Sequence, residues 1–231
     1  MRIKRISISI PLLALILCLL AGCVSNGAKS NVPDWMWPDA QSKEEEKIVT
    51  VSMGLTFNTN GNGTCNVKSM GTCQDTALVI PPVSPAGERV VAIEAEAFLD
   101  CRELMSVVLP AGIEQIGKSA FSGCEQLAAI NLPDSLRQIG ERAFEGCKAL
   151  REICVPSSLV HIGEMAFYGC RRLKKAEFER TSGWQVTLGE SDLWFGNLEK
   201  EAKIASESLS DPARAAELLK DNYVYHNWSR R

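Results

Sequence analysis

The feature that most constrains the fold is a phrase that recurs every 23 residues. "AFLDCRELMSVVLP" begins at residue 97, and similar phrases begin at residues 120, 143 and 166. In each copy a cysteine follows the phenylalanine by three residues and a leucine by six, and an isoleucine precedes the phenylalanine by five. A period of about 20–29 residues with the pattern L-x-x-L-x-L is typical of leucine-rich repeats. The aligned phenylalanines are Phe98, Phe121, Phe144 and Phe167.

Each copy contains two short segments with different periods. Ile130 and Leu132 alternate with polar positions, which predicts a short strand with both side chains on one face, and a proline then ends it. Phe144, Cys147 and Leu150 recur every three residues, which predicts one face of a helical or 3₁₀ turn. One coil cannot bury these faces alone, because such repeats depend on their neighbours. The pattern therefore predicts a solenoid with a cap at each end.

The segments that flank the repeats carry the signals of such caps. Asn60-Gly61-Asn62-Gly63, between alternating apolar runs, predicts a β-hairpin that covers the first edge. After residue 178 the frame stops, and Asp211-Pro212 precedes "ARAAELLKDNY", which predicts a capped amphipathic helix. The expected fold class is α/β: a short leucine-rich repeat solenoid with a parallel concave sheet, an N-terminal β-hairpin cap and a C-terminal helical cap.

The first 23 residues resemble a bacterial lipoprotein signal. A basic start is followed by a mostly apolar stretch, residues 6–21, that is shorter than the roughly 18 residues expected of a spanning helix. The last four residues resemble the lipobox, which implies cleavage before Cys23 and acylation of its thiol. An uncleaved anchor or an ordinary secretory signal is the alternative. The lipobox residues are Leu20, Ala21 and Gly22, followed by Cys23.

These signals predict five segments. They are a signal peptide (1–22), a flexible tether (23–48), an N-terminal β-hairpin cap (49–75), leucine-rich repeats (76–179) and a C-terminal cap with a helix (180–231). Removal of the signal takes three basic and no acidic residues, so the formal net charge changes from −3 to −6, with 22 basic against 28 acidic residues. An acidic balance argues against a nucleic-acid ligand, which needs a basic surface.

The repeat I-G-x-x-A-F-x-x-C-x-x-L-x-x-I-x-L-P resembles that of the BspA-like (LRR_5-type) leucine-rich repeat proteins. The resemblance covers about 55–231 and includes the hairpin "NGNGT" and the tail "FERTSGW…AAELLKDNYVYHNW". It implies a curved solenoid, secretion or surface display in host-associated bacteria, and adhesion to host matrix or to other cells. The family brings no catalytic residues. This chain has few repeats and no appended immunoglobulin-like domain, unlike long family members.

The cysteines fall into three groups once Cys18 leaves with the signal and Cys23 is acylated. Those of the repeat should stack coil over coil as buried, reduced thiols, because strands about 4.8 Å apart hold parallel Cβ atoms too far apart for a disulfide. Four such ligands spread over successive coils cannot form a tetrahedral zinc site. Cys65 and Cys73 are a possible disulfide in an oxidising compartment. Cys154 should face the concave surface, as a reactive or bridging thiol or as a small strand residue.

No enzyme is expected, because the chain lacks G-x-S-x-G, P-loop and H-E-x-x-H motifs. No cofactor and no metal are expected either. Solenoids bind with the concave strand face, where a protein ligand is the expected partner. The candidate residues alternate with the buried strand positions: Ser106, Val108, Ala129, Asn131, Glu152, Cys154, Lys175 and Glu177.

Two functions follow from these features. The first is a lipid-anchored lipoprotein at the outer membrane or cell surface that binds host matrix or another cell-surface protein. The alternative is a scaffold in the periplasm or at the cell wall without a host partner. Val24, rather than Asp, follows Cys23, which in a cell with two membranes resembles the default sorting to the outer membrane.

Overall fold

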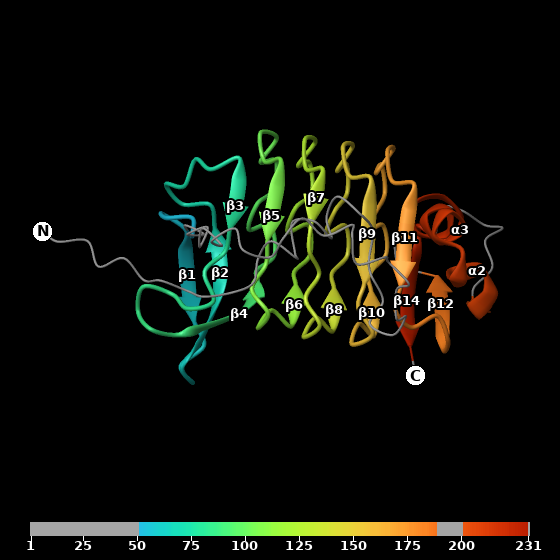
Figure 1. The fold of residues 1–231 in the computed structure, drawn as a ribbon. Coiled ribbons are helices and arrows are strands. Elements are labelled where there is room, and N and C mark those ends of the chain that lie inside the picture. The colour runs from blue at the N-terminus through green and yellow to red at the C-terminus, as the bar shows by residue number, and fades with distance from the viewer. Residues whose placement is uncertain (1–50, 189–200, 231) are drawn as a thin grey trace, which may run out of the picture. The chain divides into compact units, whose positions relative to one another are not determined.

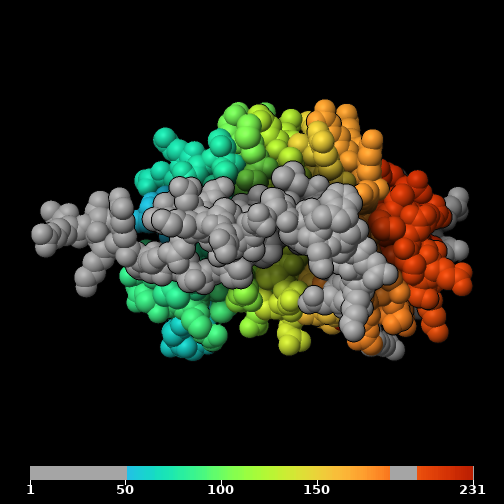
Figure 2. Space-filling model, viewed as in Figure 1, coloured from blue at the N-terminus to red at the C-terminus, as the bar shows by residue number. Residues whose placement is uncertain are grey.

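The computed structural model describes residues 51–188 and 201–230 (Figure 1). The predicted signal peptide, its lipobox residues Leu20, Ala21 and Gly22, the acylation site Cys23 and the tether lie outside these residues. So do residues 189–200 and Arg231 of the predicted C-terminal cap. The coils follow one another in the order of the sequence, as the colours of the space-filling view show (Figure 2).

A first ladder of short parallel strands is formed by the L-x-x-I-x-L segments, as the repeat predicts. Hydrogen bonds join its strands as β3-β5-β7 and β9-β11, and β7 lies against β9. The partners are residues 23 apart from β5 onward, for example Ser106 with Ala129 and Glu152 with Lys175. The strands are β3 (Ala77–Val79), β5 (Ser106–Val108), β7 (Ala129–Ile130), β9 (Glu152–Val155) and β11 (Lys175–Phe178).

A second parallel ladder is formed by four segments that end in the repeated isoleucine, with β2 of the N-terminal hairpin as its first strand, and the sequence did not predict it. Gln115 pairs with Gln138, and His161 continues the row. Three of these strands are only two residues long, too short for a period to be visible in the sequence. Figure 1 shows them as a separate row of arrows. The strands are β2 (Thr64–Ser69), β4 (Arg89–Ile93), β6 (Gln115–Ile116), β8 (Gln138–Ile139) and β10 (His161–Ile162).

The Ala-Phe-x-x-Cys segment is a run of tight turns that also hydrogen-bonds to the next coil. The amide of Cys124 donates to the carbonyl of Phe121 in its own coil (3.2 Å). The amide of Phe121 donates to the carbonyl of Ala143 in the next coil, and that of Gly123 to the carbonyl of Glu145, both at 2.8 Å. The predicted turn is therefore present, and alternate amides of the turn serve to stack the coils.

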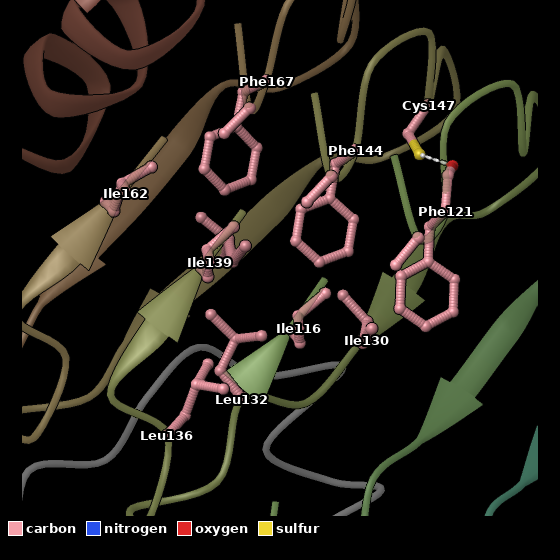
Figure 3. Close-up of a cluster of buried hydrophobic side chains, with 14 of the residues drawn as sticks. Ile116, Phe121, Ile130, Leu132, Leu136, Ile139, Phe144, Cys147, Ile162 and Phe167 are labelled. Carbon is pink, nitrogen blue, oxygen red and sulfur yellow. Dashed lines mark hydrogen bonds between the residues drawn. The ribbon is translucent and has the colours of Figure 1, made fainter. Parts of the chain in front are cut away.

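Columns of identical side chains fill the core between the ladders and the turns. The four repeat phenylalanines stack with ring centroids 5.0, 5.5 and 5.4 Å apart and planes within 13° of parallel. Figure 3 shows Ile116, Ile139 and Ile162 of the second ladder beside three of these rings. All of these side chains are at most 1% exposed. Burial of this apolar surface is the main stabilising term of the solenoid.

The N-terminal cap is the predicted hairpin. Strand β1 (Thr56–Thr59) pairs antiparallel with β2, and β2 pairs in parallel with β4 of the first coil. Gly61 and Gly63 of the turn have φ values of 75° and 76°, a region that favours glycine. The hairpin thus occupies the edge at which the second ladder begins.

The C-terminal cap combines the predicted helix with strands that the sequence did not predict. The helical part comprises α2 (Ser206–Ser210), α3 (Pro212–Glu217) and the π-helical turn η3 (Leu218–Asn222). As predicted, the Asp211 carboxylate caps α3, accepting hydrogen bonds from the amides of Ala213 and Arg214. Helix α3 packs against β11, the last strand of the first ladder.

Three antiparallel strands close the second ladder at its C-terminal edge. Strand β14 (His226–Arg230) pairs with β10, β12 (Trp184–Leu188) with β14, and β13 (Glu201–Lys203) with β12. The rings of Trp184 and Trp228 are 1% exposed and meet edge to face, 6.2 Å between centroids. These strands are determined by tertiary contacts, because each of them pairs with a strand that is distant in the sequence.

Candidate interaction surface

The outward side chains of the first ladder form two rows that run across the coils. One row holds Ala77, Ser106, Ala129, Glu152 and Lys175; the other holds Val79, Val108, Asn131, Cys154 and Glu177. The structure therefore brings the eight predicted surface residues together on one face. Seven of the eight are half-buried, and Lys175 is exposed. Side chains are small from β3 to β7, and charges appear on β9 and β11.

Asn131 differs from the other candidates because both polar atoms of its amide bond to the preceding coil. Its Oδ1 accepts a hydrogen bond from the amide of Leu109 (2.7 Å), and its Nδ2 donates to the carbonyl of Leu109 (2.9 Å). The side chain thus continues the ladder beyond the end of β7. While these bonds hold, they fix the orientation of the amide and occupy one of its two N–H groups.

We expect Asn131→Ala to lower the free energy of unfolding by about 1–3 kcal/mol, because it leaves an amide and a carbonyl of Leu109 without their partners. Urea denaturation monitored by circular dichroism measures the loss. Glu152→Ala is the matched control on the same face, with an expected change within about 0.5 kcal/mol. Equal stability of both variants would contradict a structural role for the Asn131 amide.

Two serines bridge neighbouring coils in the same manner and were missed from the sequence. Ser135 Oγ donates to the carbonyl of Ile113 (2.6 Å), and Ser158 Oγ donates to the carbonyl of Leu136 (2.7 Å). The repeated P-x-S-L at 133–136 and 156–159 was the available signal. Like Asn131, these serines satisfy backbone groups at the coil corners.

Three of the four repeat cysteines, Cys124, Cys147 and Cys170, are buried and reduced as the sequence predicts, and each has a backbone acceptor; Cys101 of the first copy is reduced but only half-buried. Cys124 donates to the carbonyl of Phe98 (3.1 Å), and Cys147 donates to that of Phe121 (3.3 Å; Figure 3). Cys170 repeats the contact with the carbonyl of Phe144 (3.2 Å). Burial raises the pKa of Cys124 and of Cys170 to about 12, and it raises the pKa of Cys147 still further.

These thiols predict a loss of stability at alkaline pH. An unfolded cysteine has a pKa near 8.5, whereas the folded thiols resist ionisation. Above pH ~8.5 the unfolded chain releases protons that the folded chain retains. The free energy of unfolding therefore falls as pH rises from about 8.5 toward 12, by up to ~1.4 kcal/mol per pH unit for each thiol. Cys147→Ala should have a shallower pH dependence in urea denaturation between about pH 8 and 10; an unchanged slope would contradict this assignment.

Cys65 and Cys73 do not form the predicted disulfide; both are free and buried. Cys65 lies near the start of β2, and its Sγ donates to the carbonyl of Glu88 (3.7 Å). Cys73 follows the far end of that strand, beyond Ser69. An extended strand rises about 3.3 Å per residue, so the run from Cys65 to Ser69 carries the chain away from Cys65 before the turn that holds Cys73.

The leucine-rich repeats predicted from the sequence agree with a match of the chain to a protein family. The BspA-type leucine-rich repeat region matches residues 91–189 in six copies. This segment is a BspA-type leucine-rich repeat region. The match extends beyond the four aligned copies of the phenylalanine motif and includes most of β4 and all of β12. It therefore contains the strands of both parallel ladders from β4 onward. No curated protein matches the chain.

Solved leucine-rich repeat proteins of several bacteria resemble the chain. A Treponema pallidum leucine-rich repeat protein is 34% identical with a TM-score of 0.51, over 54% of this chain and 57% of that one. One from Bacteroides capillosus is 26% identical (TM-score 0.48) over 57% and 98% of the chains. One from Bacteroides ovatus is 29% identical (TM-score 0.41) over 57% and 40%. The chain therefore spans little more than half of the T. pallidum protein.

Proteins with BspA-type and other leucine-rich repeats are typically non-enzymatic modules that mediate protein–protein interaction. Across residues 51–188 and 201–230, no group of three or more His, Cys, Asp or Glu is placed to hold a metal ion. His161 is half-buried on β10, where burial lowers its pKa, and His226 is buried against Tyr223 in the C-terminal cap. No helix of the described part of the chain is long and apolar enough to cross a membrane.

Proposed function

We propose that the outward face of the first ladder binds a protein ligand, and that the chain displays this face at the cell surface in adhesion to host matrix or to another cell. The observation that carries the proposal is the pair of side-chain rows on the first ladder, whose strands are held in register by backbone hydrogen bonds. Because the backbone amides of these strands are paired within the ladder, the outward side chains are what a partner would meet.

The composition of the rows favours a protein partner over a small molecule. Ala77, Ser106 and Ala129 leave the face low and flat from β3 to β7, and exposed Met105 (51%) lies beside it. Glu152 and Lys175 add charges of both signs at the other end. An open face that combines small, apolar and charged side chains is suited to a protein interface, whereas small-molecule sites are concave and enclosed.

The proposed display depends on acylation of Cys23. Lipid chains on the mature amino terminus would hold the protein on a membrane, since each buried methylene contributes about 0.8 kcal/mol. Residues 24–48 would then separate the repeats from the membrane. The predicted repeats begin at residue 76, beyond this tether and the hairpin, so an anchor on the outer surface would present the outward face of the first ladder to other cells or to matrix.

Protease treatment of intact cells tests the location. An antibody to residues 116–178 should lose its signal without lysis, and Cys23→Ala should release the protein from the membrane fraction. Protection until the cells are permeabilised would instead favour the periplasmic or cell-wall scaffold. Retention of Cys23→Ala in the membrane fraction would contradict the lipid anchor.

A photo-crosslinking amino acid tests the face. Placed at residue 129 on the first ladder, it should give covalent adducts with a protein ligand on cells or on matrix. Placed at residue 138 on the second ladder, it is the matched control and should give none. Adducts from residue 138 alone would move the binding site to the other face.

A further inference from the structure

The last two coils carry a cluster of basic side chains that the repeat pattern does not require. It comprises Lys148, Arg151, Arg171, Arg172, Lys174 and Lys175, all exposed, and is named here the basic corner. Apart from Arg102, which corresponds to Lys148 and Arg171, the corresponding positions of earlier coils hold other types, among them Glu125, Ala128 and Ala129. The cluster is therefore a property of this end of the solenoid and not of the packing of a coil.

Coil stacking brings these side chains together. The amide of Lys174 donates to the carbonyl of Arg151 (2.8 Å), and Lys175 pairs with Glu152 in the β9–β11 register. Lys148 and Arg171 occupy the same position of successive coils, and coils of a ladder are about 4.8 Å apart. Basic side chains thus lie in adjacent rows along one corner of the molecule.

Most of this charge lacks an internal counter-ion. Within the described residues, Arg151, Arg171, Arg172, Lys174 and Lys175 form no ion pair, while Lys148 pairs with Glu125 at 2.9 Å. The nearby carboxylates on the first ladder are Glu152 and Glu177. In a chain whose formal net charge is −3, a local excess of unpaired cations is free to attract an external anion.

We propose that the basic corner binds a sulfated polysaccharide, a ligand class beyond the protein partner proposed above. Exposed ion pairs contribute at most about 1 kcal/mol each, so only a polymer that engages several cations at once would be retained. The planar guanidinium groups of Arg151, Arg171 and Arg172 match the paired oxygens of a sulfate ester. Sulfates spaced along a chain would meet the successive rows.

Two other polyanions fit the corner less well. Membrane-surface binding usually adds apolar side chains that enter the lipid, but the segments 148–151 and 171–175 contain none of the exposed large apolar residues of the described chain, which are Met53, Val83, Leu99, Met105, Val160 and Tyr168. Single-stranded nucleic acid needs aromatic stacking platforms. The exposed aromatic residue nearest in sequence is Tyr168, whose ring already contacts that of Tyr225 (6.1 Å between centroids).

The test is the affinity of the full chain, in detergent, for immobilised heparin at about 0.05–0.3 M NaCl. We expect salt-sensitive binding that the triple variant R171E/R172E/K174E weakens on the order of tenfold or more. The matched control K68E/R89E/R137E changes the net charge equally at exposed positions outside the corner, and should lose less than about threefold by the same reasoning. Desulfated heparin should not bind.

Other outcomes would overturn the proposal: no binding of the wild-type chain to heparin, an equal loss in both triple variants, or tighter binding to DNA or to phosphatidylserine vesicles than to heparin. Circular dichroism and thermal melting check that each variant is folded. R171Q/R172Q, which removes charge without adding repulsion, replaces the triple variant if that one does not fold, with a loss expected in the same direction. Because heparin binding needs neither a protein partner nor surface display, its failure leaves the proposed function untouched.

Discussion

Replacing Phe144 with alanine should lower the free energy of unfolding by about 4 kcal/mol, near the upper range for a buried aromatic side chain. The Phe144 ring is 0% exposed and stacks on Phe121 on one side (5.5 Å) and on Phe167 on the other (5.4 Å). Its removal leaves a cavity between two coils that the hydrogen-bonded turns hold apart. The backbone amides above and below are already paired, so the coils cannot close the gap without breaking those bonds.

Urea denaturation measures this loss. Leu99→Ala is the control, since Leu99 lies next to the first ring of the stack but is 43% exposed. Its expected cost is below about 1 kcal/mol. A loss below about 1 kcal/mol for Phe144→Ala would show that the phenylalanine column is not the main source of stability.

The solenoid could be predicted because its repeat is visible in the sequence as a fixed spacing of residue types. Phe121, Cys124 and Leu127 recur with the same spacing in every copy, and these columns are buried apart from Cys101 of the first copy, which is half-buried. The hairpin turn and the Asp211 cap were predictable for a similar reason, since local backbone geometry selects those residue types. In such a protein each coil repeats the same local sequence pattern, so the fold can be predicted with few assumptions about contacts between residues distant in the sequence.

The second ladder was not predictable because its strands are defined by their neighbours. Gln138-Ile139 has no period of its own; it is a strand because Gln115-Ile116 and His161-Ile162 lie on either side. The same holds for β14, which pairs with β10 from 64 or more residues away along the chain. Pairing over such distances leaves no signal in either segment alone.

The candidate surface was predictable in position but not in detail. Alternation along the strands places Ala129 and Glu152 on the outward face, and the ladder register pairs Ala129 with Ser106 and Glu152 with Lys175. The engagement of Asn131 with Leu109 was not readable, because an amide that pairs with backbone 22 residues earlier has the same pattern as one that faces a ligand. The possible disulfide between Cys65 and Cys73 was wrong because sequence proximity did not reveal the strand between them.

The second large effect is expected at Gly140, where there is no room for a side chain. A Cβ atom there would lie 2.6 Å from the amide nitrogen of Lys118 and 2.7 Å from the carbonyl carbon of Gly117, both backbone atoms of the preceding coil. Gly140→Ala should therefore lower the free energy of unfolding by about 3 kcal/mol. The melting temperature should fall by roughly 6–12 °C for a domain of this size.

Glu94→Ala is the matched control, because Glu94 occupies the same repeat position in the first coil. The spatial neighbour of Glu94 on the N-terminal side is strand β2 and not a repeat turn. The amide of Glu94 donates to the carbonyl of Val67 (2.9 Å), and the Glu94 carboxylate accepts hydrogen bonds from the side chain of exposed Asn58. The expected cost is below about 1 kcal/mol. Equal stability of the two variants would show that the coils can separate at this position without penalty.

The spacing of the coils is thus set from two sides. Gly117, Gly140 and Gly163 let backbone approach backbone at the corner where the second ladder ends, and the phenylalanine rings fix the distance across the core. In a repeat array each coil is stabilised only by its neighbours, so a clash at Gly140 weakens the contact on which both halves depend. Gly140→Ala should therefore reduce the cooperativity of unfolding as well as its midpoint, and a smaller denaturant slope with an intermediate would be the sign of that separation.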